Sequence, residues 1–386
     1  MLYEYRLNPK IETVDRPDSP LTSWCSDDLG LDAVRRQLEG WHPDVVYCNG
    51  LENVELERAI TEQHNAILYA HSYHGTCISG RKCFSYPQIA PCRRTLGAGC
   101  LALYLPRRCG GLNPATMWSM YQDQSKRKAG LQRYRAVLVA SEYMRDEFAR
   151  HGVSQDRLRV VALPVSGPAL PATTRDPGGN ILFIGRLVDV KGVANLVKAI
   201  PAAQQQLGRK LKVTLAGSGA EQAALQSLAR QFGVAADFQG WAEADKKHEL
   251  MANADLLAVP SLWPEPFGLV GIEAACFGLP AVGYNVGGIR SWLTPGESGE
   301  IAPGDPPSVA GLADAIVRAL SDPAHYRRLR EGAWKISARF RLDRHLNELE
   351  PMLATSGNAL RDFSQAVSRV VEDPEGQTTH SMGRKS

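Results

Sequence analysis

Short apolar runs alternate with amphipathic stretches along the second half of the chain. Runs such as NILFIG, LKVTLAG and DLLAVPS have the length and β-branched content of buried strands. The stretches between them place apolar residues three or four positions apart, which is typical of helices packed on a sheet. The pattern predicts strands at 180–185, 211–217, 236–240, 255–261 and 280–284, and helices at 193–207, 221–232, 246–254, 268–277, 307–320, 324–340 and 342–353.

The first half carries the same alternation. Apolar runs predict strands at 45–48, 66–70, 136–140 and 158–163, and the pattern predicts helices at 51–63 and 142–151. Ser141 is the expected N-cap of the second helix. Strands that alternate with helices form parallel sheets covered by helices. The expected fold is therefore α/β, with two facing, Rossmann-like, doubly wound domains.

The domain boundaries follow from composition. The segment PVSGPALPATTRDPGGN is rich in Pro and Gly, so we expect a linker at 166–180 between an N-terminal domain (1–165) and a C-terminal domain (181–355). Residues 356–386 are polar and weakly patterned, and we expect a loose tail there. No strand followed by a glycine-rich turn precedes Leu31. The N-terminal domain is therefore expected to lack the first strand of a doubly wound fold, either because the chain is truncated there or because the domain is degenerate.

The overall composition excludes several classes of protein. The 386 residues carry 44 Lys and Arg against 41 Asp and Glu, a net charge of +3, so nucleic acid is not an expected partner. No apolar run approaches the roughly 20 residues of a membrane span, and the N-terminus lacks a signal pattern. We therefore expect a cytoplasmic protein. Eight cysteines are too few for a disulfide framework, which favours reduced thiols.

Positive charge is concentrated between Arg81 and Arg135, where eleven Lys or Arg residues accompany one acid, Asp123. A solvated face is one interpretation. The other is a docking surface for an anionic partner, either a phosphate-bearing acceptor or the inner face of an anionic membrane. The apolar stretch CLALYL, followed by Arg107 and Arg108, suits shallow contact with a membrane.

Five cysteines lie in or beside the same window. They are Cys77, Cys83, Cys92, Cys100 and Cys109. Structural zinc sites use close pairs of the type Cys-x2-Cys, and none occurs here. The spacing therefore favours buried or free thiols, and no metal site is predicted.

The strongest chemical motif is SLWPEPFGLVGIEAACFGLPAVG. A strand ends near Ser261, and a helix that begins around Gly268 points its N-terminus, a ready phosphate site, past the strand ends. Glu273 is the only charge in that apolar helix, and a buried carboxylate needs donors such as ribose hydroxyls. Taken singly, Glu273 could form a structural ion pair and Glu265 could be an exposed loop acid. Their spacing around Pro-Phe-Gly makes the pair more specific.

A second motif, GRLVDVKG, follows directly on the strand NILFI. It places Arg186 at the carboxyl end of the strand, where open α/β sheets bind ligands, and Lys191 at a helix start. Two cations beside a helix N-terminus are typical of a diphosphate clamp, although they could also be ordinary surface cations. The turn LAGSGAE provides another strand-to-glycine turn, at Gly217, where backbone can approach a ligand closely.

These motifs, with GGIRSWLTPGESGEIAPGD, resemble the nucleotide-sugar domain of family 4 glycosyltransferases, which are retaining enzymes of the GT-B fold. The resemblance covers Asn180–Leu353 closely. It covers Pro43–Leu163 more loosely, through AILYAHSYHG and VLVASEYMRDEFARHGV. It implies a nucleoside-diphosphate sugar as donor substrate, no cofactor, and a carbohydrate, lipid-linked or small-molecule acceptor.

The resemblance also implies roles for single residues. Glu265 would contact hydroxyls of the donor sugar, Glu273 would bind the ribose, and Arg186 with Lys191 would stabilise the departing diphosphate. His71 would reach the donor sugar, although a histidine after a strand is by itself more often structural. The remaining donor-binding candidates are Gly185, Gly217, Trp241, Phe267, Gly268 and Leu269. The chain holds no Asp-x-Asp triplet, so no divalent metal is expected at the diphosphate.

Three departures from the family pattern leave alternatives open. The opening strand and glycine-rich loop are not seen before Leu31, Arg290-Ser291 follows GG-I where an acid is common, and ALPVSGP replaces an Asn-Gly pair. A nucleotide-sugar binder with impaired catalysis is therefore the second hypothesis. The third is another GT-B enzyme, such as a phosphorylase or a sugar-nucleotide epimerase.

Overall fold

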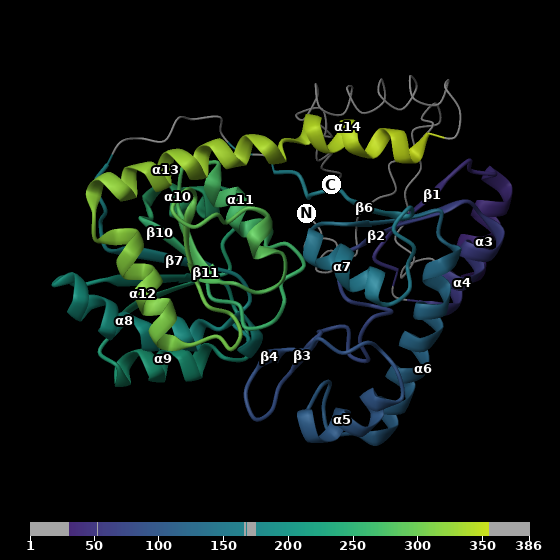
Figure 1. Cartoon of the computed structure of the whole chain (residues 1–386), viewed down its shortest axis with the longest axis horizontal. Coiled ribbons are helices and arrows are strands. Elements are labelled where there is room, and N and C mark those ends of the chain that lie inside the picture. Colours follow the sequence, from purple (N-terminus) through teal and green to yellow (C-terminus); the bar gives the residue numbers. More distant parts are fainter. Residues whose placement is uncertain (1–30, 52, 166, 168–174, 355–386) are drawn as a thin grey trace, which may run out of the picture.

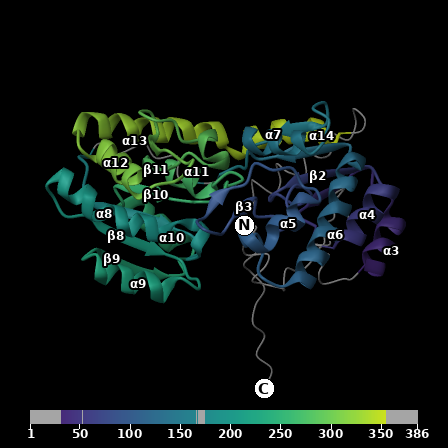
Figure 2. The ribbon, with the colours of Figure 1, turned by 60° about the horizontal axis from the view of Figure 1, so that its bottom comes forward.

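The computed structural model describes residues 31–51, 53–165, 167 and 175–354. They form two parallel sheets, each in its own α/β domain, with the domains side by side (Figures 1 and 2). In the N-terminal sheet the strands follow the order β1-β2-β5-β6. Their bounds are β1 (Val46–Asn49), β2 (Ala66–Ala70), β5 (Ala136–Val139) and β6 (Leu158–Val160).

The C-terminal sheet has six parallel strands in the order β12-β11-β10-β7-β8-β9. Their bounds are β7 (Asn180–Ile184), β8 (Lys212–Ala216), β9 (Ala235–Gly240), β10 (Leu256–Val259), β11 (Ala281–Tyr284) and β12 (Gly299–Ala302). After β7, the chain adds β8 and β9 on one side of that strand. It then adds β10, β11 and β12 on the other side. The strand order therefore reverses between β7 and β10, and such a switch point is where open α/β sheets bind ligands.

Helices pack around both sheets. In the N-terminal part they are α3 (Leu31–Trp41), α4 (Val54–Gln63), α5 (Gly99–Arg107), α6 (Pro114–Gly130), η1 (Leu131–Arg133) and α7 (Glu142–Arg150). In the C-terminal part they are η2 (Asp189–Lys191), α8 (Val193–Leu207), α9 (Gln222–Gln231), α10 (Ala244–Asn253), α11 (Leu269–Ala275), η3 (Gly287–Ser291), α12 (Val309–Leu320), α13 (Pro323–Ser337), η4 (Ala338–Phe340) and α14 (Leu342–Leu353).

The strands expected from apolar runs all form, although β6 is three residues shorter than expected. Ser141 caps α7 as predicted, because its Oγ accepts a hydrogen bond from Met144 N at 3.3 Å. The pattern missed α3, α5, α6 and β12. The reason is clearest in α6, which buries the polar side chains of Gln124 and Arg127 and so shows no ordinary apolar face.

The segment between β2 and β5 forms a separate lobe, which we call the α5–α6 lobe. It consists of α5, α6 and a small antiparallel pair, β3 (Cys83–Phe84) and β4 (Ala90–Pro91), and it lies below the N-terminal sheet in Figure 1. A small core of its own holds it together, made of Ile78, Leu96, Tyr104 and Cys109. Loops beside β3 and β4 reach the C-terminal domain through the ion pairs Arg81–Asp189 and Arg93–Asp305.

The last described helix crosses back to the other domain. Figures 1 and 2 show α13 beside the C-terminal sheet and α14 continuing along the same side of the molecule over the N-terminal sheet. His345 of α14 hydrogen-bonds the carbonyl of Ala162 at 2.8 Å, and Val165 N donates to Phe340 O. Residues 342–353, expected in the C-terminal domain, thus pack on the N-terminal one.

The expected linker at 166–180 lies largely outside the described residues, as do the tail at 356–386 and the N-terminal 30 residues. Within the described ranges, no helix combines the length and the apolar character needed to cross a bilayer.

Candidate active site

The two chemical motifs meet at the switch point of the C-terminal sheet. The loop Gly185–Gly192 follows β7, and the loop from Pro260 to Gly268 follows its neighbour β10. Leu262 N donates to Val190 O at 2.8 Å, so the two loops touch along their backbones. Gly192 has a left-handed φ of 68°, and a Cβ there would lie 1.9 Å from Pro260 O, so only glycine permits this contact.

Lys191 and Glu265 form an ion pair where these loops meet. Ser261 Oγ donates a second hydrogen bond to the same carboxylate at 2.7 Å. Glu265 is only 5% exposed, so the interpretation of this residue as an exposed loop acid is wrong. Burial alone would raise the pKa of Glu265, but the charge and hydrogen bond of Lys191 and the Ser261 hydroxyl outweigh it and hold that pKa below its usual value. Glu265 is therefore an ionised, buried hydrogen-bond acceptor.

The loop that carries Glu265 is fixed by backbone contacts that the sequence did not reveal. Gly288 N donates to Glu265 O at 2.6 Å, and Trp292 Nε1 donates to Phe267 O at 2.7 Å. Gly268 is the N-cap of α11 with a φ of 86°, so Gly268 and Leu269 stand at the start of that helix as predicted. Gly288 of η3 and the adjacent Trp292 thus hold the backbone of the loop that carries Glu265.

Glu273 lies on α11, the helix that follows the loop of Glu265. Its carboxylate accepts a hydrogen bond from Lys247 Nζ of α10 at 2.7 Å, and both side chains are about one-quarter exposed. The expectation of a buried carboxylate is corrected to a half-buried one, because α11 is short and its Glu273 face borders α10 rather than the core. The ion pair foreseen as an alternative is present.

Strand ends beside the switch point supply further candidates. Gly217, after β8, has a φ of 138° and no room for a Cβ, which would lie 1.9 Å from Gly185 O. Arg186 is exposed at the end of β7. Trp241 follows the edge strand β9, is half exposed, and donates from Nε1 to Glu243 at 3.0 Å. These residues share the carboxyl edge of the sheet with Lys191 and Glu265.

His71 lies at the carboxyl end of β2 in the other domain. Its Nε2 contacts Asn49 Oδ1 at the end of β1, and its ring packs on Tyr69 with centroids 4.7 Å apart. Burial lowers the pKa of His71 to about 4, so the imidazole is neutral near neutral pH. His71 is thus held at the edge of its sheet, and contacts to the second domain come from other residues.

Two N-terminal residues that sequence reasoning missed make those contacts. Ser141 Oγ donates to Pro266 O at 2.6 Å, so the start of α7 rests on the loop of Glu265. The Tyr73 ring meets the Trp263 ring edge-on, with centroids 6.4 Å apart. For Ser141 the sequence signal was its position at a predicted helix cap. For Tyr73 there was none.

Within the described chain, no group of three or more His, Cys, Asp or Glu side chains is arranged to hold a metal ion. The cysteines of the basic window are free thiols. Burial raises the pKa of Cys83 and of Cys109 to about 12, so both are inert at neutral pH.

In the folded protein, acids from other segments offset much of the positive charge of the window 81–135. Several of its cations pair with acids from outside the window. These pairs are Arg81–Asp189, Lys82–Glu147, Arg93–Asp305, Lys126–Glu55, Arg127–Glu57 and Arg133–Glu62. The side chains of Arg107 and Arg108 instead lie over the rings of Phe84 and Tyr86, with guanidinium-to-centroid distances of 5.1 and 4.9 Å.

Comparisons with known proteins find relatives of the domain that carries this site. Residues 174–335 match the family model for glycosyl transferases group 1. Glycogen synthase of Mycobacterium tuberculosis is 33% identical over 214 residues, which cover 53% of this chain and 50% of that protein. The chain thus matches about half the length of this curated relative.

Two solved structures show the fold. Sucrose-phosphate synthase from Thermosynechococcus elongatus superimposes with a TM-score of 0.61 at 20% identity, over 89% of this chain and 77% of that one. Anabaena HepE in complex with UDP and glucose gives a TM-score of 0.59 at 17% identity, over 90% and 83% of the two chains. The two Rossmann-like domains are those of the GT-B fold. Residues 174–335 of this chain are thus a glycosyl transferases group 1 domain within the GT-B fold.

Proposed function

We propose that this protein is a retaining glycosyltransferase that transfers a sugar from a nucleoside-diphosphate sugar to an acceptor hydroxyl. The observation that carries the proposal is the buried Lys191–Glu265 pair at the switch point, between two strand-end loops. Anabaena HepE, which has the same fold, was solved with UDP and glucose, and this supports a donor of that class. Retention rests on the family resemblance.

The leaving diphosphate gains negative charge as the anomeric bond breaks. The side chain of Lys191 is 22% exposed, and its ammonium group has three N–H donors. The ion pair with Glu265 leaves other donors for phosphate oxygens. Arg186 would approach from the end of β7, and the start of α11 at Gly268 and Leu269 would add backbone N–H groups. Such preorganised charge is usually the largest contribution to catalysis. It would also serve the diphosphate without a divalent metal.

The sugar and the nucleoside would be held by acceptor groups. The ionised Glu265 accepts hydrogen bonds only, which suits the hydroxyls of the donor sugar. The carboxylate of Glu273 would either release Lys247 and bind the ribose hydroxyls, or bind Lys247 and the ribose hydroxyls together. The neutral His71 would face the sugar as a hydrogen-bonding group. Gly185, Gly217, Phe267 and Trp241 would line the donor site.

The experiment is a titration of the protein with UDP, GDP and ADP and with their sugar conjugates, followed by assay of transfer. Binding of one nucleotide that weakens in Arg186→Ala supports the donor site, and transfer that keeps its rate in EDTA supports metal independence. A folded protein that binds none of these nucleotides contradicts the proposal. Binding without turnover toward any acceptor points to the second hypothesis, a binder with impaired catalysis.

We further propose that the α5–α6 lobe contacts an anionic membrane that carries the acceptor. Leu112, in the loop between α5 and α6, is 64% exposed, and Trp118, on α6, is 52% exposed; both are close in sequence to Arg107 and Arg108. Exposed apolar side chains beside cations are typical of shallow binding to anionic lipid.

A further inference from the structure

Tyr73 stands out among the buried tyrosines of the described chain. Its side chain is fully buried, yet its hydroxyl has no hydrogen-bond partner. Buried Tyr69, Tyr134 and Tyr326 each donate to an oxygen, at 2.6, 3.0 and 2.8 Å respectively. An unpaired buried polar group costs about 1–3 kcal/mol, so a protein rarely keeps one without a functional reason.

A second buried donor, weakly paired, lies across the domain boundary from Tyr73. The indole Nε1 of Trp263 is buried and interacts with the Glu265 carboxylate, which helps to lower the pKa of Glu265, but it makes no hydrogen bond of good geometry. The rings of Tyr73 and Trp263 meet edge-on. One donor therefore comes from each domain, and both lie at the same point of the interface.

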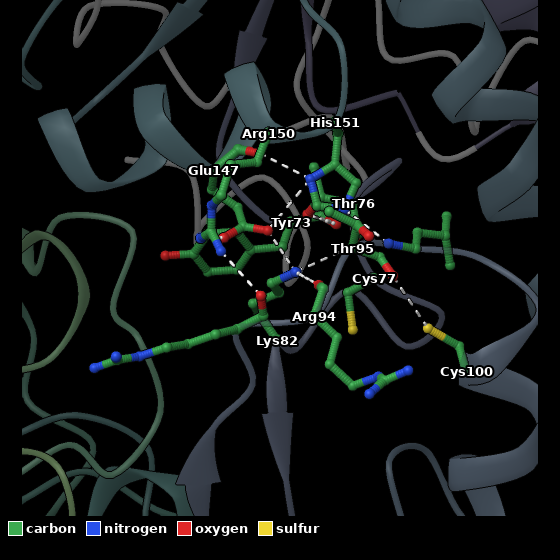
Figure 3. A network of polar contacts seen from close by, with 12 residues as sticks. Tyr73, Thr76, Cys77, Lys82, Arg94, Thr95, Cys100, Glu147, Arg150 and His151 are labelled. Carbon is green, nitrogen blue, oxygen red and sulfur yellow. Dashed lines mark hydrogen bonds and ion pairs between the residues drawn. The ribbon is translucent and has the colours of Figure 1, made fainter.

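This point adjoins the candidate active site. Trp263 is two residues before Glu265, and Lys191 Nζ lies 5.7 Å from its ring centroid. Tyr73 is two residues after His71. Figure 3 shows Tyr73 on its other side, beside the buried network of Lys82, Glu147 and His151.

The charges around the two donors select the kind of ligand they can take. Burial, with the neighbouring Tyr143, Glu147 and Glu265, raises the pKa of Tyr73 well above its usual value. The phenol thus keeps its proton and can donate. Two donors require acceptor oxygens. The nearby carboxylates already pair with Lys82 and Lys191, which favours a neutral ligand over an anion such as phosphate. A neutral polyhydroxylated group meets both conditions.

We propose that Tyr73 and Trp263 bind the sugar ring of the donor and contribute to the choice of sugar. This inference rests on the proposed function. In the free protein the Tyr73 hydroxyl is unpaired and the Trp263 indole is only weakly paired, because the sugar oxygens supply their partners. Trp263 would hold the sugar next to Glu265, and Tyr73 would hold it next to His71.

The test uses Tyr73→Phe, which removes one oxygen, with Tyr134→Phe as the matched control. Tyr134 is equally buried but donates to Glu57, away from the site. Without ligand, Tyr134→Phe should lower Tm, whereas Tyr73→Phe should leave Tm unchanged or raise it. Calorimetry with UDP, GDP and ADP and their glucose conjugates then compares nucleotide with nucleotide-sugar binding.

For the nucleotide that binds, Tyr73→Phe should weaken the glucose conjugate about 3- to 10-fold and leave the free diphosphate unchanged. Trp263→Phe should weaken the conjugate as well. The inference is overturned if Tyr73→Phe lowers Tm as much as Tyr134→Phe, or if it leaves affinity for the conjugate unchanged while the diphosphate binds. Wild-type protein that binds no diphosphate overturns the proposed function, and the inference with it.

Discussion

Lys191 and Glu265 are 74 positions apart in the sequence, and they form a buried ion pair because the strands that precede them are neighbours. The pair joins a cation suited to phosphate to a carboxylate suited to sugar hydroxyls. Either group alone would be an ordinary charged loop residue. Together they place both chemistries of a nucleotide sugar at the same strand ends.

Replacing Glu265 with Gln should lower the rate of sugar transfer about 100-fold or more, because an ionised acceptor beside the reacting sugar is lost. Affinity for the free nucleoside diphosphate should change little, since Lys191 and Arg186 remain. Steady-state kinetics with calorimetry on the same sample measures both. Glu249→Gln, in an exposed pair with Lys246, is the control. Wild-type turnover in Glu265→Gln would contradict the assigned role.

Glu273 and Lys247 allow ribose binding to be separated from ion pairing. If Glu273 binds the ribose, Glu273→Gln should weaken nucleoside diphosphate binding about 10-fold, the value of a lost charged hydrogen bond. Lys247→Met should not weaken it and should cost less than about 1 kcal/mol of stability, because the pair is partly exposed. Unchanged nucleotide affinity in Glu273→Gln would leave Glu273 with a structural role only.

Lys82 and Glu147 form a buried ion pair at the centre of the network in Figure 3. Both side chains are almost fully buried. Lys82→Met removes the buried cation that faces Glu147 and leaves it only the partly exposed Arg150, so the variant should lose up to about 3–5 kcal/mol of stability in urea denaturation. The double variant Lys82→Met with Glu147→Leu should recover most of that loss. A single variant as stable as wild type would show that the pair is not desolvated.

His151 should make the protein less stable in mild acid. Its Nδ1 donates to Glu147 O at 2.8 Å and its Nε2 accepts from Leu96 N at 2.9 Å, so the native fold requires the neutral ring. Burial lowers the pKa of His151 to about 4. The unfolded state, with a pKa near 6.5, then binds the extra proton. Stability should fall by about 1.4 kcal/mol per pH unit from this residue as pH drops from about 6.5 to about 4. Denaturation across that range measures the slope, and His151→Gln should reduce it.

Replacing both Arg107 and Arg108 with Gln should weaken binding to phosphatidylserine vesicles. Each cation near an anionic surface contributes about 1 kcal/mol, so the loss should exceed 10-fold at low salt. Leu112→Ser with Trp118→Ser should weaken the same binding through the loss of apolar contact. Nucleotide affinity should stay unchanged in both variants, and Arg230→Gln, in the other domain, is the control. Equal sedimentation of all variants would argue against membrane contact by the α5–α6 lobe.

Local patterning determined much of the C-terminal domain. Periods of two and of about 3.6 residues in the apolar positions are short-range signals, and they place β7, α8, β10 and α14 within a residue or two of their observed bounds. The same kind of signal identified the glycine turn at Gly217 and the cap at Ser141. It failed for α6, whose buried face is formed by Gln124 and Arg127.

Only the tertiary structure decided which of these pieces meet. The sequence contains Lys191, Glu265 and Ser261, but their contact depends on the reversal of strand order between β7 and β10. The window 81–135 has a large charge by count, yet acids such as Glu57 and Glu147 reach it from elsewhere in the fold. Tyr73 and Trp263 show nothing unusual until their two domains pack together. Patterning is encoded by near neighbours in the chain, whereas pairing, burial and unpaired donors arise only when distant segments share one environment.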